Sequence, residues 1–253
     1  MRALLICLPA MFVATVNAQI TPLTFQSSGK QTALIELYTS EGCSSCPPAE
    51  TWLSRLKESP ALWKDFVPLA IHVDYWDYLG WRDPWASKSF SDRQRAYAKQ
   101  WRSDSIYTPG FVLDGKEWRD SGRKDGPKPA SVKAGVLTVT SSDTNRWQVS
   151  FAPANAANAD YEVHAALLAG SLSSNVKAGE NRGHLLRHDF VVLKFAKASL
   201  VRSGDVAQGE FVLNKQRNAA ESDLALAIWI TPAGRLDPLQ ATGGWLARPA
   251  SGR

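Results

Sequence analysis

The sequence predicts an α/β domain followed by a mostly antiparallel, sandwich-like β domain. Residues 33–39 and 66–73 are short apolar runs that flank an amphipathic helical pattern, which is the order of a parallel strand–helix–strand unit. Beyond residue 130, further apolar runs are separated by turn-rich gaps, and no strong helical pattern lies between them. These two patterns predict two domains of different character.

The first 18 residues predict a cleavable signal peptide. Arg2 supplies a basic start, residues 3–16 are almost wholly apolar, and Ala18 is a small residue suited to signal peptidase. The apolar run is too short to span a bilayer. We therefore expect an exported protein, periplasmic or secreted, that begins near Gln19 and is soluble after cleavage.

The elements of the expected α/β domain, residues 19–128, each have a local signal. Pro47 and Pro48 suit the first turn of a helix, where a missing N–H group costs nothing, and Pro60 ends that helix. A second helix is expected to start at Ser91, with Gln94 as its capping-box partner. These signals place a cysteine pair at the junction between the first strand and the first helix.

A hairpin and a run of strands complete the expected architecture. An Asp-Gly pair at 114–115 between two short apolar runs predicts a β-hairpin. Residues 121–130 are rich in Gly, Pro, Lys and Asp and mark a domain boundary. The β domain, residues 129–253, is expected to contain strands at 136–140, 147–151, 161–168, 190–195, 210–213 and 224–230.

The cysteines are the most informative residues. Of the three in the chain, Cys7 lies in the expected signal peptide, which leaves Cys43 and Cys46 in an oxidising compartment. A Cys-x-x-Cys pair is a redox-active dithiol, a site for Cu(I) or another soft metal, or a structural disulfide. The structural role is the weakest of the three as a stabiliser, because so small a ring removes little entropy from the unfolded chain.

A Cys-x-x-Cys at a strand–helix junction, followed by Thr108-Pro109 before a hairpin, is the thioredoxin-fold arrangement. The longer motifs at 36–50, 72–84, 93–94, 107–109 and 179–183 resemble those of an uncharacterised thioredoxin-like family of secreted bacterial proteins. The resemblance implies a thioredoxin-like domain in which Pro109 is cis and faces the disulfide. It implies a reaction only by analogy.

We assign roles to the residues of this site. Cys43 at the helix N-terminus is the expected nucleophile, since the helix dipole favours its thiolate, and Cys46 is the resolving cysteine. Thr108 and Pro109 are expected to bind the backbone of a partner, with Tyr107 and Trp76 as further substrate-binding residues. Glu36, a buried acid on the first strand, either transfers the proton of the resolving cysteine or has a structural role, in which it points to the sheet edge or pairs with a basic residue.

The predicted function is thiol–disulfide exchange with the thiols and disulfides of protein partners, among them a redox partner protein. It needs no cofactor besides the Cys43–Cys46 disulfide. The net charge of +5 is scattered, so nucleic acid is not an expected partner. Two alternatives stay open: a periplasmic Cu(I) or soft-metal carrier that uses the same cysteines, with His72 as a conceivable third ligand, and a non-catalytic interaction protein.

The remaining features are expected to be structural, and we assign no metal ligand. His72 is expected to be a hydrogen-bonded core histidine. His184, His188 and Asp189 could bring two imidazoles to one face of a strand, although a surface role is favoured. The aromatic residues at 75–90 either pack in the core or form an apolar wall beside the disulfide. Residues 179–183 form either a loop that reaches the site or a long hairpin turn.

Overall fold

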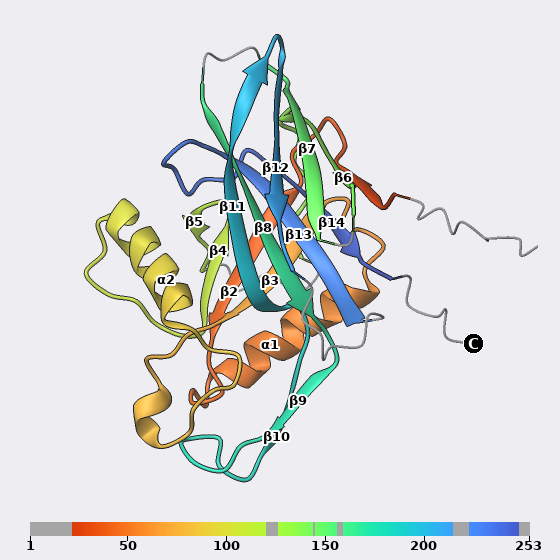
Figure 1. Cartoon of the computed structure of the whole chain (residues 1–253). Coiled ribbons are helices and arrows are strands. Elements are labelled where there is room, and N and C mark those ends of the chain that lie inside the picture. The colour runs from red at the N-terminus through yellow and green to blue at the C-terminus, as the bar shows by residue number, and fades with distance from the viewer. Residues whose placement is uncertain (1–21, 120–125, 144, 156–158, 215–222, 248–253) are drawn as a thin grey trace, which may run out of the picture.

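The computed structural model describes residues 22–119, 126–143, 145–155, 159–214 and 223–247 (Figure 1). The predicted signal peptide, residues 1–18, lies outside this part of the chain, as does Cys7. The described residues contain fourteen strands, two α-helices and two short 3-10 segments. None of their helices has the length and apolar character needed to cross a membrane.

The first half of the chain contains both helices. Its elements are β1 (Thr24–Gln26), β2 (Ala33–Thr39), α1 (Cys46–Arg55), β3 (Phe66–His72), α2 (Lys88–Trp101), β4 (Gly110–Leu113) and β5 (Lys116–Glu117), with 3-10 segments at Leu56–Glu58 and Asp77–Leu79. The predicted parallel pairing of β2 with β3 and the predicted hairpin of β4 and β5 are confirmed. All the residues of β2 and β3 are buried, as expected for parallel strands covered on both faces.

Helix α2 begins earlier than the sequence predicted. Its N-cap is Ser87, whose side chain accepts a hydrogen bond from the backbone N–H of Ser89. Ser91, the predicted start, is buried within the helix and donates its hydroxyl to Asp74. The capping-box prediction was therefore wrong, because Ser87 in an extended conformation supplies the cap first.

The second half of the chain is formed by strands. They are β6 (Gly135–Ser141), β7 (Arg146–Pro153), β8 (Tyr161–Ala169), β9 (Leu172–Asn175), β10 (Leu185–His188), β11 (Val191–Ser203), β12 (Val206–Val212), β13 (Leu224–Pro232) and β14 (Gln240–Trp245). All six strands predicted in this half are present. The sequence analysis missed β9, β10 and β14, which are short or poor in alternating apolar residues.

The predicted fold class was wrong. Twelve of the described strands form a single mixed sheet, so the chain is mostly β and is not an α/β thioredoxin-like domain followed by a separate sandwich. The junction is β11, which pairs parallel with β3 and antiparallel with β8 and β12. One edge of β3 pairs with β2, and β11 pairs with its other edge at Val191 and Ala70. The division into residues 19–128 and 129–253 stays a prediction.

The two helices lie against opposite faces of β2. Side chains alternate between the faces of a strand, so Glu36 and Thr39 point in opposite directions. Glu36 accepts a hydrogen bond from Tyr97 of α2, whereas Thr39 donates one to Glu50 of α1. The hairpin of β9 and β10 lies beside α1, at the lower end of the molecule in Figure 1. This arrangement places the cysteine pair and this hairpin together.

Candidate functional site

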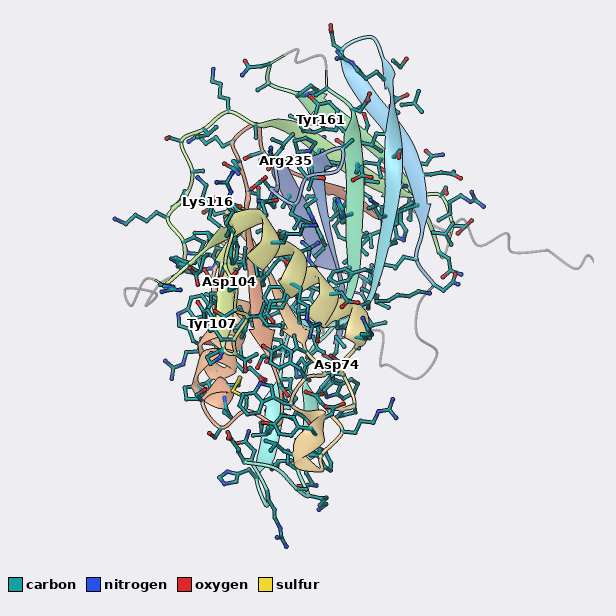
Figure 2. The ribbon with its side chains drawn as sticks, turned by 90° about the vertical axis from the view of Figure 1, so that its left-hand side faces the viewer. Asp74, Asp104, Tyr107, Lys116, Tyr161 and Arg235 are labelled. Atoms are coloured by element: carbon teal, nitrogen blue, oxygen red, sulfur yellow. A yellow bond between two sulfur atoms is a disulfide. The ribbon has the colours of Figure 1, made fainter. Side chains whose placement is uncertain are left out.

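Cys43 and Cys46 form a disulfide at the N-terminus of α1, with their Cα atoms 5.5 Å apart. Figure 2 shows it as a yellow bond in the same lower part of the molecule as the labelled Tyr107 and Asp74. Both cysteines have 0% exposure, while Ser44 and Ser45 between them are exposed. The cysteine predicted to be the nucleophile, Cys43, is therefore as buried in this structure as the predicted resolving cysteine, Cys46.

The tip of the β9–β10 hairpin holds the disulfide loop. Asn181 Nδ2 donates to the backbone carbonyls of Glu41 and Cys43, both at 2.9 Å. Glu180 accepts the backbone N–H of Ser44 at 2.9 Å, and hydrogen bonds from Ser44 lower the pKa of the Glu180 carboxyl. Residues 179–183 are thus a hairpin turn that also reaches the site. The two alternatives left open by the sequence are both correct.

Trp76 joins the disulfide loop to the predicted partner-binding loop. The Thr108-Pro109 bond is cis, as the sequence resemblance implied. Trp76 Nε1 donates to Thr108 Oγ1 at 2.8 Å, and a Cβ at Gly42 would lie only 2.8 Å from Trp76 Cβ. Glycine at position 42 therefore allows the indole to pack against the loop, and Trp76 connects it to Thr108.

Tyr107 lies at the outer side of this region. The residue is 41% exposed, and its hydroxyl donates to Glu117 on β5 at 2.5 Å. Arg119 lies over the ring, 5.8 Å from its centroid. The structure thus directs the Tyr107 hydroxyl toward β5 and leaves much of the ring in solvent. Its role in substrate binding stays a prediction.

The aromatic segment at 75–90 is mainly anchored in the protein. Phe90 is buried and packs edge to face on Phe195, and the Tyr75 hydroxyl donates to Gln94. Trp81 Nε1 donates to Glu41 Oε2 at 2.6 Å, directly before the cysteine pair. Tyr78 alone among the aromatic residues of this segment is highly exposed, at 79%. The packing alternative therefore describes this segment better than an open apolar wall.

Five buried acidic and histidine residues, which we name the acid–histidine cluster, gather beside the disulfide loop: Glu41, Glu50, His72, Asp83 and His188. His188 lies between two carboxylates, with Nδ1 in contact with Glu50 Oε2 and Nε2 3.0 Å from Glu41 Oε1. His72 Nδ1 lies 2.7 Å from Asp83 Oδ2. The two imidazole rings pack edge to face, with centroids 5.1 Å apart.

The carboxylates decide the electrostatics of this cluster. Burial alone would lower the pKa of His188, but its hydrogen bonds with Glu41 and Glu50 outweigh burial and raise the pKa to about 10. Burial likewise opposes the charged form of His72, and the neighbouring Asp83 carboxylate raises the pKa above its ordinary value. The pKa of Asp83 is lowered because His72 outweighs its desolvation. Both imidazoles are thus strongly coupled to carboxylates.

Glu36 lies on the opposite face of β2 and belongs to another network. Arg93 donates to both carboxylate oxygens, at 2.7 and 3.0 Å, and Tyr97 and Tyr38 donate to the same carboxylate. The pairing with a basic residue, which was one of the two alternatives, is therefore present. Proton transfer by Glu36 to the cysteines stays a prediction.

The group His184, His188 and Asp189 does not form. The imidazole of His188 points into the acid–histidine cluster, while His184 is exposed. Asp189 instead pairs with Lys57 at 2.6 Å. His188 is the last residue of β10, and Asp189 lies in the bend that follows the strand, where it faces Lys57.

The sequence analysis missed Glu41, Glu50, Asp83 and Asn181 as parts of the site. A signal was present: Glu41 and Glu50 flank the cysteine pair within one motif, and Asp83 and His72 lie in another. Acidic residues on both sides of a Cys-x-x-Cys are unusual for a buried turn, because each carboxylate needs a partner. The partner, His188, comes from more than 130 residues away and could not be assigned from spacing.

Comparison with protein families now gives an assignment. A family model described as a protein of unknown function, DUF1223, matches residues 34–231. The chain belongs to the DUF1223 family. This assignment replaces the thioredoxin-like family predicted from the motifs, and the mostly β architecture of this family member agrees with the correction. No curated protein matches the chain.

Two solved structures share the fold. AGR_C_4864 from Agrobacterium tumefaciens has 22% sequence identity and a TM-score of 0.62, and the match covers 87% of this chain and 97% of that one. HBP35 of Porphyromonas gingivalis has 14% identity and a TM-score of 0.57, with 90% and 79% covered. At these identities the likeness concerns the fold alone.

Proposed function

We propose that the protein carries out thiol–disulfide exchange with protein partners through Cys43 and Cys46. The observation that carries the proposal is the disulfide between Cys43 and Cys46, the first residue of α1, joined through Trp76 to the Thr108-Pro109 loop. A helix N-terminus stabilises a thiolate, which is the reactive form of cysteine. We also propose that the protein is exported to the periplasm or beyond, where such a disulfide persists.

The proposed reaction has two steps. In the dithiol form, the Cys43 thiolate attacks a sulfur of a partner disulfide, and the released partner thiolate takes a proton from solvent. The Cys46 thiolate then attacks the Cys43 sulfur of the mixed disulfide and releases the second partner thiol. One partner disulfide is reduced while the Cys43–Cys46 bond forms, and the reverse sequence oxidises a partner.

Access to the sulfurs controls this reaction. Both cysteines have 0% exposure, and Asn181 bonds to the carbonyl of Cys43. A partner sulfur has to lie in line with the disulfide, so the loop or the hairpin tip has to shift before attack. The exposed Ser44 and Ser45 provide the side from which a partner approaches. In this proposal Thr108 and Pro109 receive the partner backbone, with Trp76 and Tyr107 beside them.

The first test is the reduction potential of Cys43–Cys46, measured against glutathione and dithiothreitol buffers. A potential of about −120 to −200 mV supports oxidation or isomerisation of partners, and about −270 mV with rapid exchange supports reduction. A disulfide that stays closed below about −300 mV and exchanges slowly would contradict the proposal.

A trapping experiment identifies the roles of the two sulfurs. Cys46→Ser is expected to accumulate mixed disulfides with partner proteins, because the resolving thiol is absent. Cys43→Ser is the matched control and is expected to trap none. Equal trapping by both variants would overturn the assignment of Cys43 as nucleophile, and stoichiometric Cu(I) binding lost with either cysteine would favour a metal carrier instead.

A further inference from the structure

Three buried side chains direct one ligand atom each toward a common space beside the disulfide loop. These ligand atoms belong to Glu50, His72 and His188, and all lie within 4.8 Å of one another. They come from three separate elements, α1, β3 and β10. We propose that Glu50, His72 and His188 bind a divalent transition-metal ion. The proposal is independent of the disulfide chemistry above.

The orientation of His72 is the first argument. Its Nδ1 is engaged by Asp83, yet its Nε2 is buried and has no hydrogen-bond partner among the described residues. A buried polar nitrogen without a partner is costly, and such atoms are rare in folded proteins. The imidazole has 0% side-chain exposure, so bulk water does not supply the partner. A metal ion bound at Nε2 would supply that partner.

Outer carboxylates support both imidazoles, which is the second argument. Metal-binding histidines almost always present their other ring nitrogen to a carboxylate or carbonyl, which fixes the tautomer and orients the ring. Asp83 occupies this position behind His72, and Glu41 occupies it behind His188. Each histidine thus has one nitrogen held by an outer carboxylate and the other directed toward the common space.

Glu50 completes the ligand set in the same manner. Its Oε1 accepts a hydrogen bond from Thr39 at 2.5 Å, and its Oε2 contacts His188 Nδ1. One oxygen is therefore oriented by a supporting group, and the other faces the imidazole. A metal bound here takes the place of the proton between Glu50 Oε2 and His188 Nδ1 and releases that proton to solvent.

Charge gives a third argument. Glu41, Glu50 and Asp83 are three buried carboxylates, and within the described residues their ion-pair partners are the two histidines alone, with no lysine or arginine. A divalent cation that displaces the protons of the two imidazoles supplies the same positive charge against these carboxylates, so it suits the cluster electrostatically.

The donor set selects the class of metal. Two imidazoles and a carboxylate suit Zn²⁺ and similar first-row ions, whereas Ca²⁺ and Mg²⁺ prefer oxygen ligands and Cu(I) prefers sulfur. Zn–N bonds of about 2.0–2.1 Å place the ligand atoms of a tetrahedral site roughly 3.4 Å apart. The widest pair of ligand atoms therefore has to close by up to about 1.4 Å. Glu50 Oε2 and His188 Nδ1, now in hydrogen-bond contact, have to move apart, and both changes are rotamer-scale movements.

The site would brace the disulfide loop. Glu50 follows Cys46 by one helical turn, and the supporting Glu41 precedes Cys43 by two residues. A bound ion would fasten α1, β3 and the β9–β10 hairpin together around the cysteine pair. We therefore expect the metal to stabilise the fold whether or not the disulfide is formed.

The test starts with purified protein that has been stripped with a chelator and dialysed. Zn²⁺ is added, free metal is removed by gel filtration, and bound metal is measured by elemental analysis. The proposal expects one Zn²⁺ per chain and a higher melting temperature. It also expects Co²⁺ to give a visible spectrum without thiolate charge-transfer bands. A wild-type protein that retains no Zn²⁺ would overturn the proposal.

Variants separate this site from the cysteines and from the surface. His72→Asn and Glu50→Gln are expected to abolish stoichiometric retention, and Asp83→Asn to weaken affinity by about 10–100-fold. His184→Asn, an exposed histidine of the same hairpin, and the double variant Cys43→Ser with Cys46→Ser are expected to retain one Zn²⁺. Loss of the metal in either of these two, or full retention in His72→Asn, would contradict the proposed ligands.

Near-ultraviolet circular dichroism checks the fold of each variant. If a ligand variant unfolds, the zinc stoichiometry and the Co²⁺ spectrum of the wild-type protein are the deciding measurements.

Discussion

Two buried histidines on opposite faces of the sheet have pKa values shifted in opposite directions. His164 stacks on Trp229, whose ring lies 5.3 Å from the guanidinium of Arg93, and its pKa is lowered to about 4 by burial and by the charge of Arg93. His188 lies between Glu41 and Glu50, and its pKa is raised to about 10. Burial disfavours the charged form in both cases.

The difference shows that charged neighbours determine the pKa of these buried imidazoles. On the α2 face, the buried Glu36 carboxylate is hydrogen-bonded by Arg93, Tyr97 and Tyr38. At His164 the positive charges of Arg93 and Lys197 outweigh the carboxylates of Glu162 and Glu36. On the α1 face, the carboxylates pair with imidazoles, and among the described residues no arginine forms an ion pair with them. In the Glu36 network the carboxylate is paired with a permanent cation, whereas the acid–histidine cluster retains groups that exchange a proton or bind a cation.

Removal of the Arg93 guanidinium breaks the Glu36 network and has the largest expected effect on the free energy of unfolding. Arg93→Met leaves the Glu36 carboxylate buried, with 1% side-chain exposure and no cation. Removal of one partner from a buried ion pair typically costs about 3–5 kcal/mol of unfolding free energy. Chemical denaturation of wild type and variant measures this loss.

Two controls define the origin of that loss. Lys57→Met removes the more exposed ion pair with Asp189 and is expected to cost at most about 1 kcal/mol. The double variant Glu36→Gln with Arg93→Met is expected to lose less stability than Arg93→Met alone, because no charge is stranded. Mixed-disulfide resolution at an unchanged rate in this double variant would contradict the predicted proton transfer by Glu36.

The pH dependence of stability tests the contrast between the histidines. The folded-state pKa of His164, about 4, lies below the ordinary 6.5, so the unfolded chain binds a proton first as the pH falls. The contribution of His164 to the free energy of unfolding is therefore fully present above pH 6.5. It falls by up to about 3 kcal/mol as the pH is lowered from 6.5 to about 4. His164→Gln is expected to flatten the profile in this window, while the exposed His184→Gln is expected to retain it. Identical profiles for the two variants would contradict the assignment.

The local elements were predictable from the sequence, and the long-range pairings were not. Strand β2 was placed correctly because seven consecutive residues read as a buried strand between turn signals, and the hairpin of β4 and β5 was placed by its Asp-Gly turn. The pairing of Val191 with Ala70 joins β11 to β3, and no local pattern encodes a contact at such separation. This one parallel pairing turned two expected domains into one sheet.

The functional site shows the same difference between features encoded locally and features that depend on long-range contacts. Cys43, Cys46 and the cis Pro109 were found through short motifs. Glu36 stood out as an acid in an apolar strand, and proton transfer and pairing with a basic residue were both left open because that property alone does not reveal its partner Arg93. The acid–histidine cluster depends on β10, which has only four residues and gave no strand signal, and its His188 meets α1 only in three dimensions.

The smallest expected effect concerns the hairpin tip on the α1 face. Asn181→Ala removes two hydrogen bonds to the carbonyls of Glu41 and Cys43 and is expected to cost about 1–3 kcal/mol, since both buried acceptors lose the amide donor and the Cys43 carbonyl keeps only the N–H of Cys46. The same change loosens the contact that covers the disulfide, so dithiothreitol is expected to reduce Cys43–Cys46 faster than in wild type. Arg182→Ala, an exposed neighbour in the turn, is the matched control and should alter neither quantity. If Asn181→Ala is destabilised but its disulfide is reduced at the wild-type rate, the hairpin tip supports the fold without limiting access to the disulfide. The barrier to exchange would then lie in the loop of Ser44 and Ser45 itself.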